Sequence, residues 1–258
     1  MQIPKVIRHV TDPVIGRIPV PIIGGVNRGR LWSLASAAGG YMTGRRGAHQ
    51  MAVIDALLRK GDVVWDVGAH HGSVVLCAAR RVGPTGQVHA FEPAALNRTY
   101  LRRHVRWNRL ANVLIHPYAM SSYDGEAGFG GSGSSTGYSL NKGEERVPVR
   151  TAASLVAAGT APAPTFAKID VENLEGEVLA GAASILRKDS RLIISVHSAR
   201  AYASCTEFLR GAGYEIVESV ALAANVAGTW QGDPDMVCFG PACQDRERDR
   251  ETLKAISF

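Results

Sequence analysis

A carboxylate and two glycines follow a short apolar run near residue 65, in the segment Asp66-Val-Gly-Ala-His-His-Gly72. The run itself, residues 62–67, is β-branched and too short for a helix, which is typical of a buried strand. Glycines at 68 and 72 allow a ligand to approach the backbone and allow a helix to begin directly after the strand. The segment therefore predicts a strand–turn–helix unit that holds a ligand, with a purely structural turn as the alternative.

Glu92 ends a second short apolar run, QVHAFEP at 87–93. A carboxylate at this place can accept hydrogen bonds from the vicinal hydroxyls of a ribose. The first turn lacks the G-x-G-x-x-G spacing of dinucleotide sites, and the anion Asp66 would repel a pyrophosphate. A carboxylate beside glycine backbone instead suits a ligand with an ammonium and a sulfonium cation. The two segments together favour S-adenosylmethionine.

Two later apolar runs also end in titratable side chains, namely TFAKID (165–170) in Asp170 and RLIISVH (191–197) in His197. The carboxyl ends of parallel strands meet at one edge of a sheet, so these side chains should face the ligand crevice. A hydroxyl acceptor benefits from a base, typically by about 10²–10⁴-fold. We therefore predict Asp170 or His197 as the base, with Glu172 orienting the acceptor. Alternatively, the carboxylates are structural and His197 only donates to a backbone carbonyl.

The same three side chains could offer Mg²⁺ two oxygens and a nitrogen, but Mg²⁺ prefers oxygen ligands, so we assign no metal. A different feature is the run of Gly and Ser over residues 125–141. It is too polar to bury and predicts a mobile loop or a hairpin. Such a segment could close over the site as a lid or remain an ordinary surface loop.

Strand and helix patterns alternate along most of the chain, and this alternation implies a parallel sheet covered by helices on both faces. Two consecutive strands at the end indicate one antiparallel edge strand. We therefore predict an α/β fold with a doubly wound, mostly parallel sheet and an N-terminal helical extension. The predicted strands are 62–67, 87–93, 112–120, 165–170, 191–197, 214–220 and 235–240. The predicted helices are 31–42, 49–60, 73–82, 95–110, 174–186, 201–213 and a charged, solvated helix over 244–254.

Three parts follow from these patterns: an N-terminal arm with helices on the acceptor side (1–60), a ligand-binding domain (61–243) and a charged tail (244–258). The arm includes an extended stretch over 14–26, whose Arg17 and two prolines exclude a spanning helix. The four cysteines show neither zinc nor disulfide-framework spacing, which indicates a reduced, cytoplasmic protein.

The charge of +6 is unevenly distributed along the 258 residues. Residues 1–60 contain nine Lys and Arg against two Asp, a net charge of +7. Such a segment could meet an anionic substrate or associate weakly with a membrane surface, or it could simply be a solvated surface. The sequence has no basic run interleaved with aromatic residues, so we predict no binding of nucleic acid. The 46% of hydrophobic and 20% of charged residues are typical of a globular chain.

Two segments resemble the FkbM-type S-adenosylmethionine-dependent methyltransferases. Residues 64–97 resemble the cofactor-binding half of that family, and FAKIDVENLEGEVLAGA (166–182) resembles its second signature, K-I-D-V-E-G-x-E-x-x-V-L-x-G. The likeness spans about residues 45–240. It implies a class I Rossmann-like methyltransferase fold and, usually, methyl transfer to a hydroxyl of a sugar or secondary metabolite.

Residue by residue, Asn173 departs from the second signature, because the family usually has Gly there. Asn tolerates left-handed backbone angles, so we expect the turn to be kept. The positions that match the family's motifs are Asp66, Gly68, Gly72, Glu92, Pro93, Asn97, Lys168, Asp170, Glu172 and Glu175.

Taken together, the residues and the resemblance predict an O-methyltransferase that acts on a saccharide, a glycolipid or another hydroxylated small molecule, with S-adenosylhomocysteine as product. N-methylation of a small molecule or peptide, and a non-catalytic S-adenosylmethionine-binding partner protein, remain alternatives. An NAD-dependent oxidoreductase is disfavoured by the glycine spacing. The residues predicted to bind the cofactor are Asp66, Gly68, Ala69, His70, Gly72, Glu92, Pro93, Tyr118, Ala119 and Asp170.

Overall fold

A seven-stranded sheet runs through the centre of the protein. The computed structural model describes residues 14–36, 40–131, 138–140, 143, 145–218 and 235–256. Four strand pairs of the sheet are parallel, and only β13 runs antiparallel to its two neighbours. In spatial order the strands are β12 (Glu215–Glu218), β13 (Asp235–Phe239), β11 (Arg191–Ser195), β10 (Phe166–Ile169), β3 (Val63–Val67), β4 (Gln87–Phe91) and β5 (Val113–His116).

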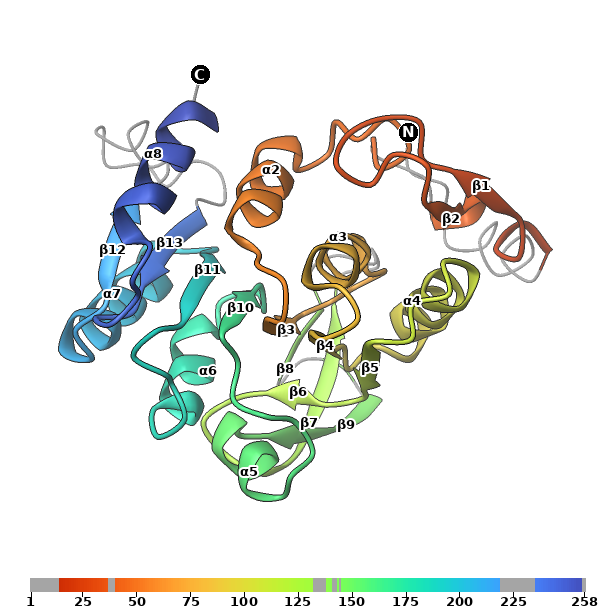
Figure 1. Cartoon of the computed structure of the whole chain (residues 1–258). Helices are drawn as coiled ribbons and strands as arrows, with labels where there is room; N and C mark the ends of the chain where they lie inside the picture. The colour runs from red at the N-terminus through yellow and green to blue at the C-terminus, as the bar shows by residue number, and fades with distance from the viewer. Residues whose placement is uncertain are drawn as a thin grey trace.

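Helices cover both faces of this sheet (Figure 1). One face packs against α2 (Ala48–Leu57), α3 (Ser73–Val82), α4 (Ala95–Trp107) and α8 (Arg246–Ile256). The other packs against α5 (Ala152–Ala157), α6 (Glu175–Ala182) and α7 (Ala199–Gly211). Successive strand residues serve opposite faces, so Val64 joins the first apolar cluster and Trp65 the second. This arrangement confirms the predicted α/β, doubly wound and mostly parallel sheet.

The antiparallel strand lies one position in from the edge, whereas we predicted it at the edge. β13 inserts between β11 and β12, and β12 takes the edge position. The order of strands along the chain cannot show this, because both positions fit two consecutive final strands. Both faces of β13 are covered in this position, which explains why four of its five residues are buried.

The predicted strand over 112–120 is divided between two sheets. Pro117 cannot donate a ladder hydrogen bond, and β5 ends just before it. After the proline, β6 (Ala119–Met120) enters a second sheet with the order β6-β9-β7-β8. Its other strands are β7 (Gly125–Gly131), β8 (Tyr138–Leu140) and β9 (Glu145–Arg150).

The Gly/Ser-rich segment predicted as a loop or hairpin therefore forms a hairpin in its described parts. β7 and β8 pair antiparallel, with Phe129 opposite Leu140. These two side chains, Ala127, Val147 and Val149 make a small apolar core of their own. Residues 132–137 and 141 of the predicted loop lie outside the described residues.

The prediction of a helix over 31–42 is wrong for the residues of this range that the structure describes. Leu31–Ser33 form β2, which pairs antiparallel with β1 (Pro19–Pro21), and Leu34–Ser36 form a short 3-10 turn, η1. Tertiary contacts override the helical spacing, because Trp32 is buried and stacks on His104 of α4 with ring centroids 3.8 Å apart. The His104 ring also bonds the backbone N–H of Ser33, with 2.9 Å between the nitrogens.

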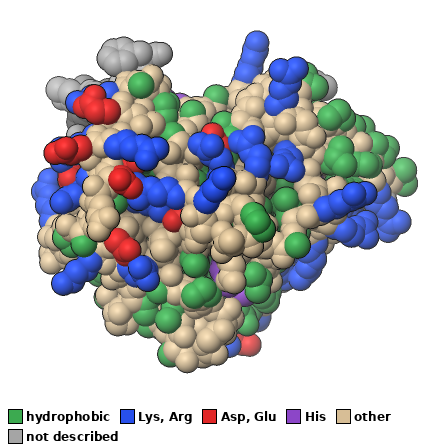
Figure 2. Space-filling model, viewed as in Figure 1, with side chains coloured by type: hydrophobic (Ala, Val, Ile, Leu, Met, Phe, Trp, Pro, Cys, Tyr) green, Lys and Arg blue, Asp and Glu red, His purple; other side chains and the backbone are tan. Residues whose placement is uncertain are grey.

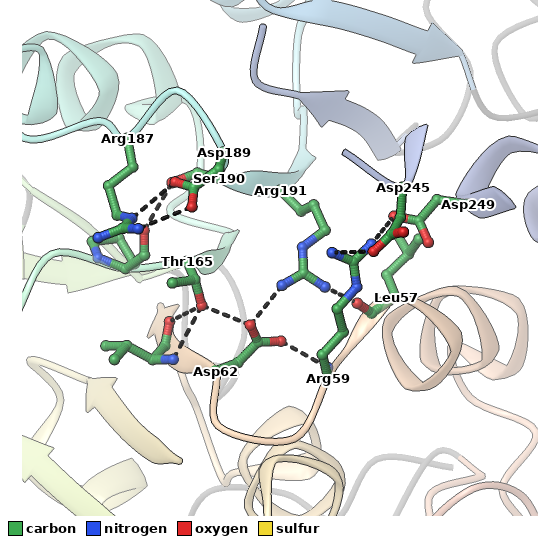
Figure 3. A network of polar contacts seen from close by, with 12 residues as sticks. Leu57, Arg59, Asp62, Thr165, Arg187, Asp189, Ser190, Arg191, Asp245 and Asp249 are labelled. Atoms are coloured by element: carbon green, nitrogen blue, oxygen red, sulfur yellow. Dashed lines mark hydrogen bonds and ion pairs between the residues drawn. The ribbon is translucent and has the colours of Figure 1, made fainter. Parts of the chain in front are cut away.

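A network of ion pairs joins α8 to the end of the sheet at which β3, β10 and β11 begin (Figure 3). Arg59 contacts Asp245 at 3.0 Å and Asp249 at 2.7 Å. Arg191 is buried and pairs with Asp62 at 2.6 Å, while its guanidinium also donates to the Leu57 carbonyl. The tail is thus helical as predicted, but one of its faces is packed rather than solvated.

From the sequence, we predicted that residues 14–26 do not form a membrane-spanning helix. Across the described ranges, no helix combines the length and the apolar character needed to cross a membrane.

Candidate active site

A cavity of about 690 Å³ opens at the carboxyl ends of β3, β4, β10 and β11. This is the edge at which open α/β sheets bind their ligands. Nine of the ten predicted cofactor-binding residues line the cavity, and so do all three predicted catalytic residues. The nine are Asp66, Gly68, Ala69, His70, Glu92, Pro93, Tyr118, Ala119 and Asp170, and the catalytic set adds Glu172 and His197.

Gly68 and Gly72 each lie where another part of the chain comes too close for a side chain to fit. Gly68 has a φ of +86°, and a Cβ placed on it would lie 2.0 Å from the backbone oxygen of Asp170. The turn after β3 and the loop after β10 therefore cross where no side chain fits. Gly72 does not line the cavity; it precedes α3 with a φ of +92°, and a Cβ there would lie 2.4 Å from a methyl group of Leu101 in α4. The missing side chain leaves room for Leu101 at the start of α3.

Asp66 is buried beside the cavity with an unsatisfied oxygen. Its Oδ2 has no hydrogen-bond partner among the described residues. Burial raises the pKa of Asp66 to about 7; Lys168 opposes the rise, and the charges of Asp170 and Glu92 add to it. A buried carboxylate in this condition is stabilised by a cation, so the site fits a ligand with an ammonium or sulfonium group.

Glu92 is held in a fixed orientation by the backbone. Its Oε2 accepts from the N–H of His70 at 2.7 Å, and its Oε1 accepts from the N–H of Ala94 at 2.8 Å. Burial nevertheless raises the pKa of Glu92 to about 7 against the effect of these bonds. A carboxylate offers about four acceptor sites, so Glu92 retains capacity to accept from the hydroxyls of a ribose.

At the end of the neighbouring strand β10, Asp170 lies between two cations. Lys168 is buried, and its Nζ contacts Oδ2 of Asp170 at 3.0 Å. Nε2 of His197 approaches Oδ1 of the same carboxylate at 3.3 Å. Burial alone would raise the pKa of Asp170, but Lys168 and His197 outweigh it and hold the pKa well below its usual range.

His197 is bound by carboxylates at both ring nitrogens. Nδ1 lies 2.8 Å from Oε1 of Glu175, whose side chain is fully buried. Burial would lower the pKa of His197, but the hydrogen bonds to Asp170 and Glu175 raise it to about 10. The ring is therefore an imidazolium at neutral pH and donates from both nitrogens. Its partners are carboxylates, not the backbone carbonyl that we considered as the alternative.

The loop between these groups has an uncommon backbone. Asn173 has a φ of +74°, which confirms that Asn keeps the left-handed turn where the family signature has Gly. Glu172 also has a positive φ, +55°, and this conformation typically costs a non-glycine residue about 1–3 kcal/mol. The backbone N–H of Asn173 donates to Glu175 at 3.1 Å. The same carboxylate therefore positions both the loop and His197.

Sequence reasoning missed a polar group on the N-terminal side of the cavity. Gln50 of α2 donates to Oγ of Ser195 at 3.0 Å and to Oδ1 of Asp235 at 2.8 Å. Oγ of Ser195 in turn contacts Lys168 at 2.7 Å and Asp235 at 2.6 Å. Ser195 had a usable signal, as a polar residue at the end of an apolar strand. Gln50 and Asp235 had none, because nothing local marks them.

The three side chains considered for Mg²⁺ are not arranged around a shared point. Both ring nitrogens of His197 are directed at carboxylates. Within the described parts of the chain, no group of three or more His, Cys, Asp or Glu residues could hold a metal ion. The four cysteines are buried as free thiols.

Comparisons with known proteins agree with this geometry. Residues 66–216, more than half of the chain, match the Methyltransferase FkbM domain. The hexuronic acid methyltransferase AglP of Haloferax volcanii is 30% identical over 142 residues, which are 53% of this chain and 56% of that protein. The crystal structure of methyltransferase FkbM from Methylobacillus flagellatus superposes with a TM-score of 0.53 at 17% identity, over 80% of this chain and 53% of that one. The chain thus spans about half the length of each relative.

The domain match, from Asp66 to Ile216, includes the second resembling segment and all but the first two residues of the first. It is a match to a methyltransferase family and not to an oxidoreductase family. This chain belongs to the FkbM family of S-adenosylmethionine-dependent methyltransferases.

Proposed function

We propose that this chain transfers the methyl group of S-adenosylmethionine to a hydroxyl oxygen of a saccharide. The observation that carries the proposal is one cavity lined by two differently charged groups of side chains. Asp66 and Glu92 provide unsatisfied carboxylate capacity at the ends of β3 and β4, and the Lys168–Asp170–His197 cluster provides a fixed ionised carboxylate at the ends of β10 and β11. The 30% identical relative named a hexuronic acid methyltransferase supports a saccharide as acceptor.

The first group, Asp66 and Glu92, fits the cofactor. Asp66 would pair with its positive charge, and Glu92 would accept hydrogen bonds from the ribose hydroxyls. The glycine turn lets the ligand approach the backbone of Gly68 and Ala69, and Pro93, Tyr118 and Ala119 line the same cavity. When bound, S-adenosylmethionine supplies a methyl group already activated by its sulfonium, and the product is S-adenosylhomocysteine.

The second group, around Asp170, fits a hydroxyl acceptor. Asp170 accepts the hydrogen bond of the hydroxyl and then its proton, as the new bond between oxygen and the methyl carbon forms and the bond from sulfur to that carbon breaks. The acceptor oxygen becomes strongly acidic at this stage, so a carboxylate with a low pKa suffices as the base. Lys168 and His197 keep Asp170 ionised beforehand, and Glu172 orients the acceptor.

His197 consequently has a positioning role in this proposal. We predicted Asp170 or His197 as the base, and the protonated state of His197 favours Asp170. Phe129 and Leu140 of the second sheet form an apolar part of the cavity wall, and this limits access of water to the reacting groups.

A second acceptor is favoured by one specific observation. Arg46 lines the cavity, and His197 is held as a cation nearby, so a sugar carboxylate would also find positive partners. A carboxylate is already ionised and needs no base. Its methylation would give a methyl ester instead of a methyl ether.

A methyl-transfer assay separates these possibilities. The full chain is incubated with methyl-labelled S-adenosylmethionine and neutral, acidic or amino sugars, and the labelled product is treated with mild alkali. Alkali releases label from a methyl ester but not from a methyl ether or an N-methyl group. We expect alkali-stable label on a sugar hydroxyl, and a loss of about 10²-fold or more in the Asp170→Asn variant, the range for a removed general base.

Asp189→Asn is the matched control, because this aspartate is exposed and pairs with Arg187 away from the cavity. Label on a sugar carboxylate that is insensitive to Asp170→Asn would select the ester. Label on an amine would select N-methylation. Tight cofactor binding without transfer to any acceptor would instead support the non-catalytic alternative.

A further inference from the structure

Ten arginines gather in two segments of the chain that contain no acidic residue. Residues 14–54 include five arginines and residues 93–123 include another five, and neither stretch holds an Asp or a Glu. None of the ten forms an ion pair with a carboxylate in the part of the chain that the structure describes. They are Arg17, Arg28, Arg30, Arg45 and Arg46, and Arg98, Arg102, Arg103, Arg106 and Arg109.

The two segments form one continuous unit. Leu31 of β2 exchanges two hydrogen bonds with the side chain of Asn108, at 2.9 and 2.8 Å. Arg103 of α4 donates to the backbone oxygen of Gly16 at 3.0 Å. Together with the stack of Trp32 on His104, these contacts hold the N-terminal segment along α4. The segments that carry these arginines are therefore neighbours in the molecule.

Most of the exposed apolar side chains lie along these two segments beside α4, but Tyr123 lies on the other face of the sheet, because its neighbours Ser122 and Asp124 contact Glu177 of α6 and Thr151 before α5. Every large hydrophobic residue that is exposed among the described residues falls in one of these two segments. Ile23 is 64% exposed and Val14 68%. The others are Ile18, Leu34, Leu96, Leu114 and Tyr123. Figure 2 shows Lys/Arg side chains across the whole view; on the right, over β1, β2 and α4, they lie beside hydrophobic side chains, whereas most Asp and Glu of this view lie on the left.

We propose that this arginine-rich apolar surface binds the face of an anionic lipid bilayer. Exposed apolar side chains in one region mark interaction sites. Aliphatic side chains beside arginines of a single sign suit the interface of a charged membrane, where the apolar groups enter the headgroup boundary and the cations meet lipid phosphates. Single-stranded nucleic acid would be bound through stacked aromatic side chains, and Tyr123 is the one aromatic residue among the seven.

The surface also reaches the cavity, because Arg46 and Tyr41 belong to the N-terminal segment and line the opening. Binding to a bilayer does not depend on methyl transfer, so the inference stands or falls separately from the proposed function.

Vesicle flotation of the full chain tests this inference. The protein is mixed with vesicles of phosphatidylcholine alone, or of phosphatidylcholine with one third phosphatidylglycerol, at low and at physiological ionic strength. We expect binding to the anionic vesicles only, and weaker binding at higher salt. The Arg102→Ala/Arg106→Ala variant should partition roughly 25-fold less, since each basic residue near an anionic bilayer contributes about a factor of five. Ile23→Ser should also weaken partition.

The matched control is Arg210→Ala/Arg248→Ala, because these two arginines are exposed and lie outside both segments. It should bind vesicles as the wild type does, and thermal unfolding checks that each variant is folded. Failure of the wild type to bind anionic vesicles would overturn the proposal. Equal loss in the control variant would also overturn it, and so would binding of a DNA or RNA oligonucleotide in place of vesicles.

Discussion

Glu175 and Asp170 hold the proton of His197 from two sides, and this has a consequence for the pH dependence of stability. The pKa of His197 in the folded chain is about 10, against an ordinary value of 6.5. A raised pKa means that the folded state binds the proton more tightly than the unfolded state. The resulting stabilisation is fully present below pH 6.5, declines between pH 6.5 and 10, and is lost above the folded-state pKa.

The His197→Gln variant measures this contribution. We expect the wild type to be more stable than the variant at pH 6, and the difference in free energy of unfolding to shrink steadily toward pH 10. Urea unfolding of both proteins at several pH values gives the difference for the cluster of His197, Asp170 and Glu175, because titrating groups outside this cluster cancel. A difference that stays constant from pH 6 to pH 10 would show that His197 is not held as a cation.

At the residue scale, the sequence was sufficient to predict those cavity residues that stand at the end of apolar runs. Asp66, Glu92, Asp170 and His197 each stand at or near the end of a strand, and the edge rule for parallel sheets brings them to one cavity. The contacts of Gln50 with Ser195 and Asp235 span 145 and 185 residues. No local pattern encodes such contacts, because they arise only when α2 packs beside the ends of β11 and β13.

The crossing of two loops at Gly68 links the first turn to the position of Asp170. An alanine there would place Cβ 2.0 Å from the Asp170 oxygen, and the backbone of one loop would have to move. We expect Gly68→Ala to unfold at lower urea concentration and to lose most of its affinity for S-adenosylhomocysteine. Calorimetric titration and urea unfolding measure the two effects.

Gly159→Ala is the control for Gly68→Ala. Gly159 has a φ of +67°, and nothing lies within 4 Å of a Cβ placed there. Gly159→Ala should therefore lose only about 1–2 kcal/mol of unfolding free energy, the conformational cost of a left-handed alanine, and should keep its ligand affinity. If the two variants lose equal stability and both bind the ligand normally, the crossing has no role in the site.

At the element scale, predictions held where local chemistry sets the limits of an element. The helix expected over 73–82 is α3 without change, between Gly72 and Gly83. Predictions failed where tertiary contacts decide. Trp32 is placed in a strand by its stack on His104, and glycines such as Gly128 belong to a hairpin strand although their composition is typical of a loop.

For the whole molecule, the Arg191–Asp62 pair joins β11 and the start of β3 to the end of α2, because Arg191 also donates to the Leu57 carbonyl (Figure 3). Asp62 also accepts from Thr165 at 2.7 Å and from the backbone N–H of Arg59 at 2.7 Å. Arg191→Met leaves this carboxylate without its buried cation, and we expect a loss of about 3–5 kcal/mol in the free energy of unfolding. Arg191→Met/Asp62→Asn should recover part of it.

Both variants should keep their affinity for S-adenosylhomocysteine, because the network lies at the edge of the sheet opposite the cavity. Urea unfolding provides the energies and calorimetry the affinity. A loss below about 1 kcal/mol for Arg191→Met would mean that the pair behaves as an exposed ion pair does.

The charge distribution of the whole molecule could be predicted from the sequence only in part. Counting residues revealed the excess of +7 in residues 1–60. It could not reveal that the arginines of α4 lie beside this segment, since that depends on Leu31 and Ser33 pairing with side chains of α4. The basic surface is therefore larger than either stretch of sequence indicates.

We propose that this cavity holds S-adenosylmethionine, with its ribose bound by Glu92. Calorimetric titration of S-adenosylhomocysteine into the wild type, Glu92→Ala and the exposed control Glu207→Ala tests it most directly, with NAD as the second ligand. We predict micromolar binding of S-adenosylhomocysteine but not of NAD, weakened by at least about 1 kcal/mol in Glu92→Ala alone. Absence of binding, or binding that is indifferent to Glu92→Ala, would contradict the account.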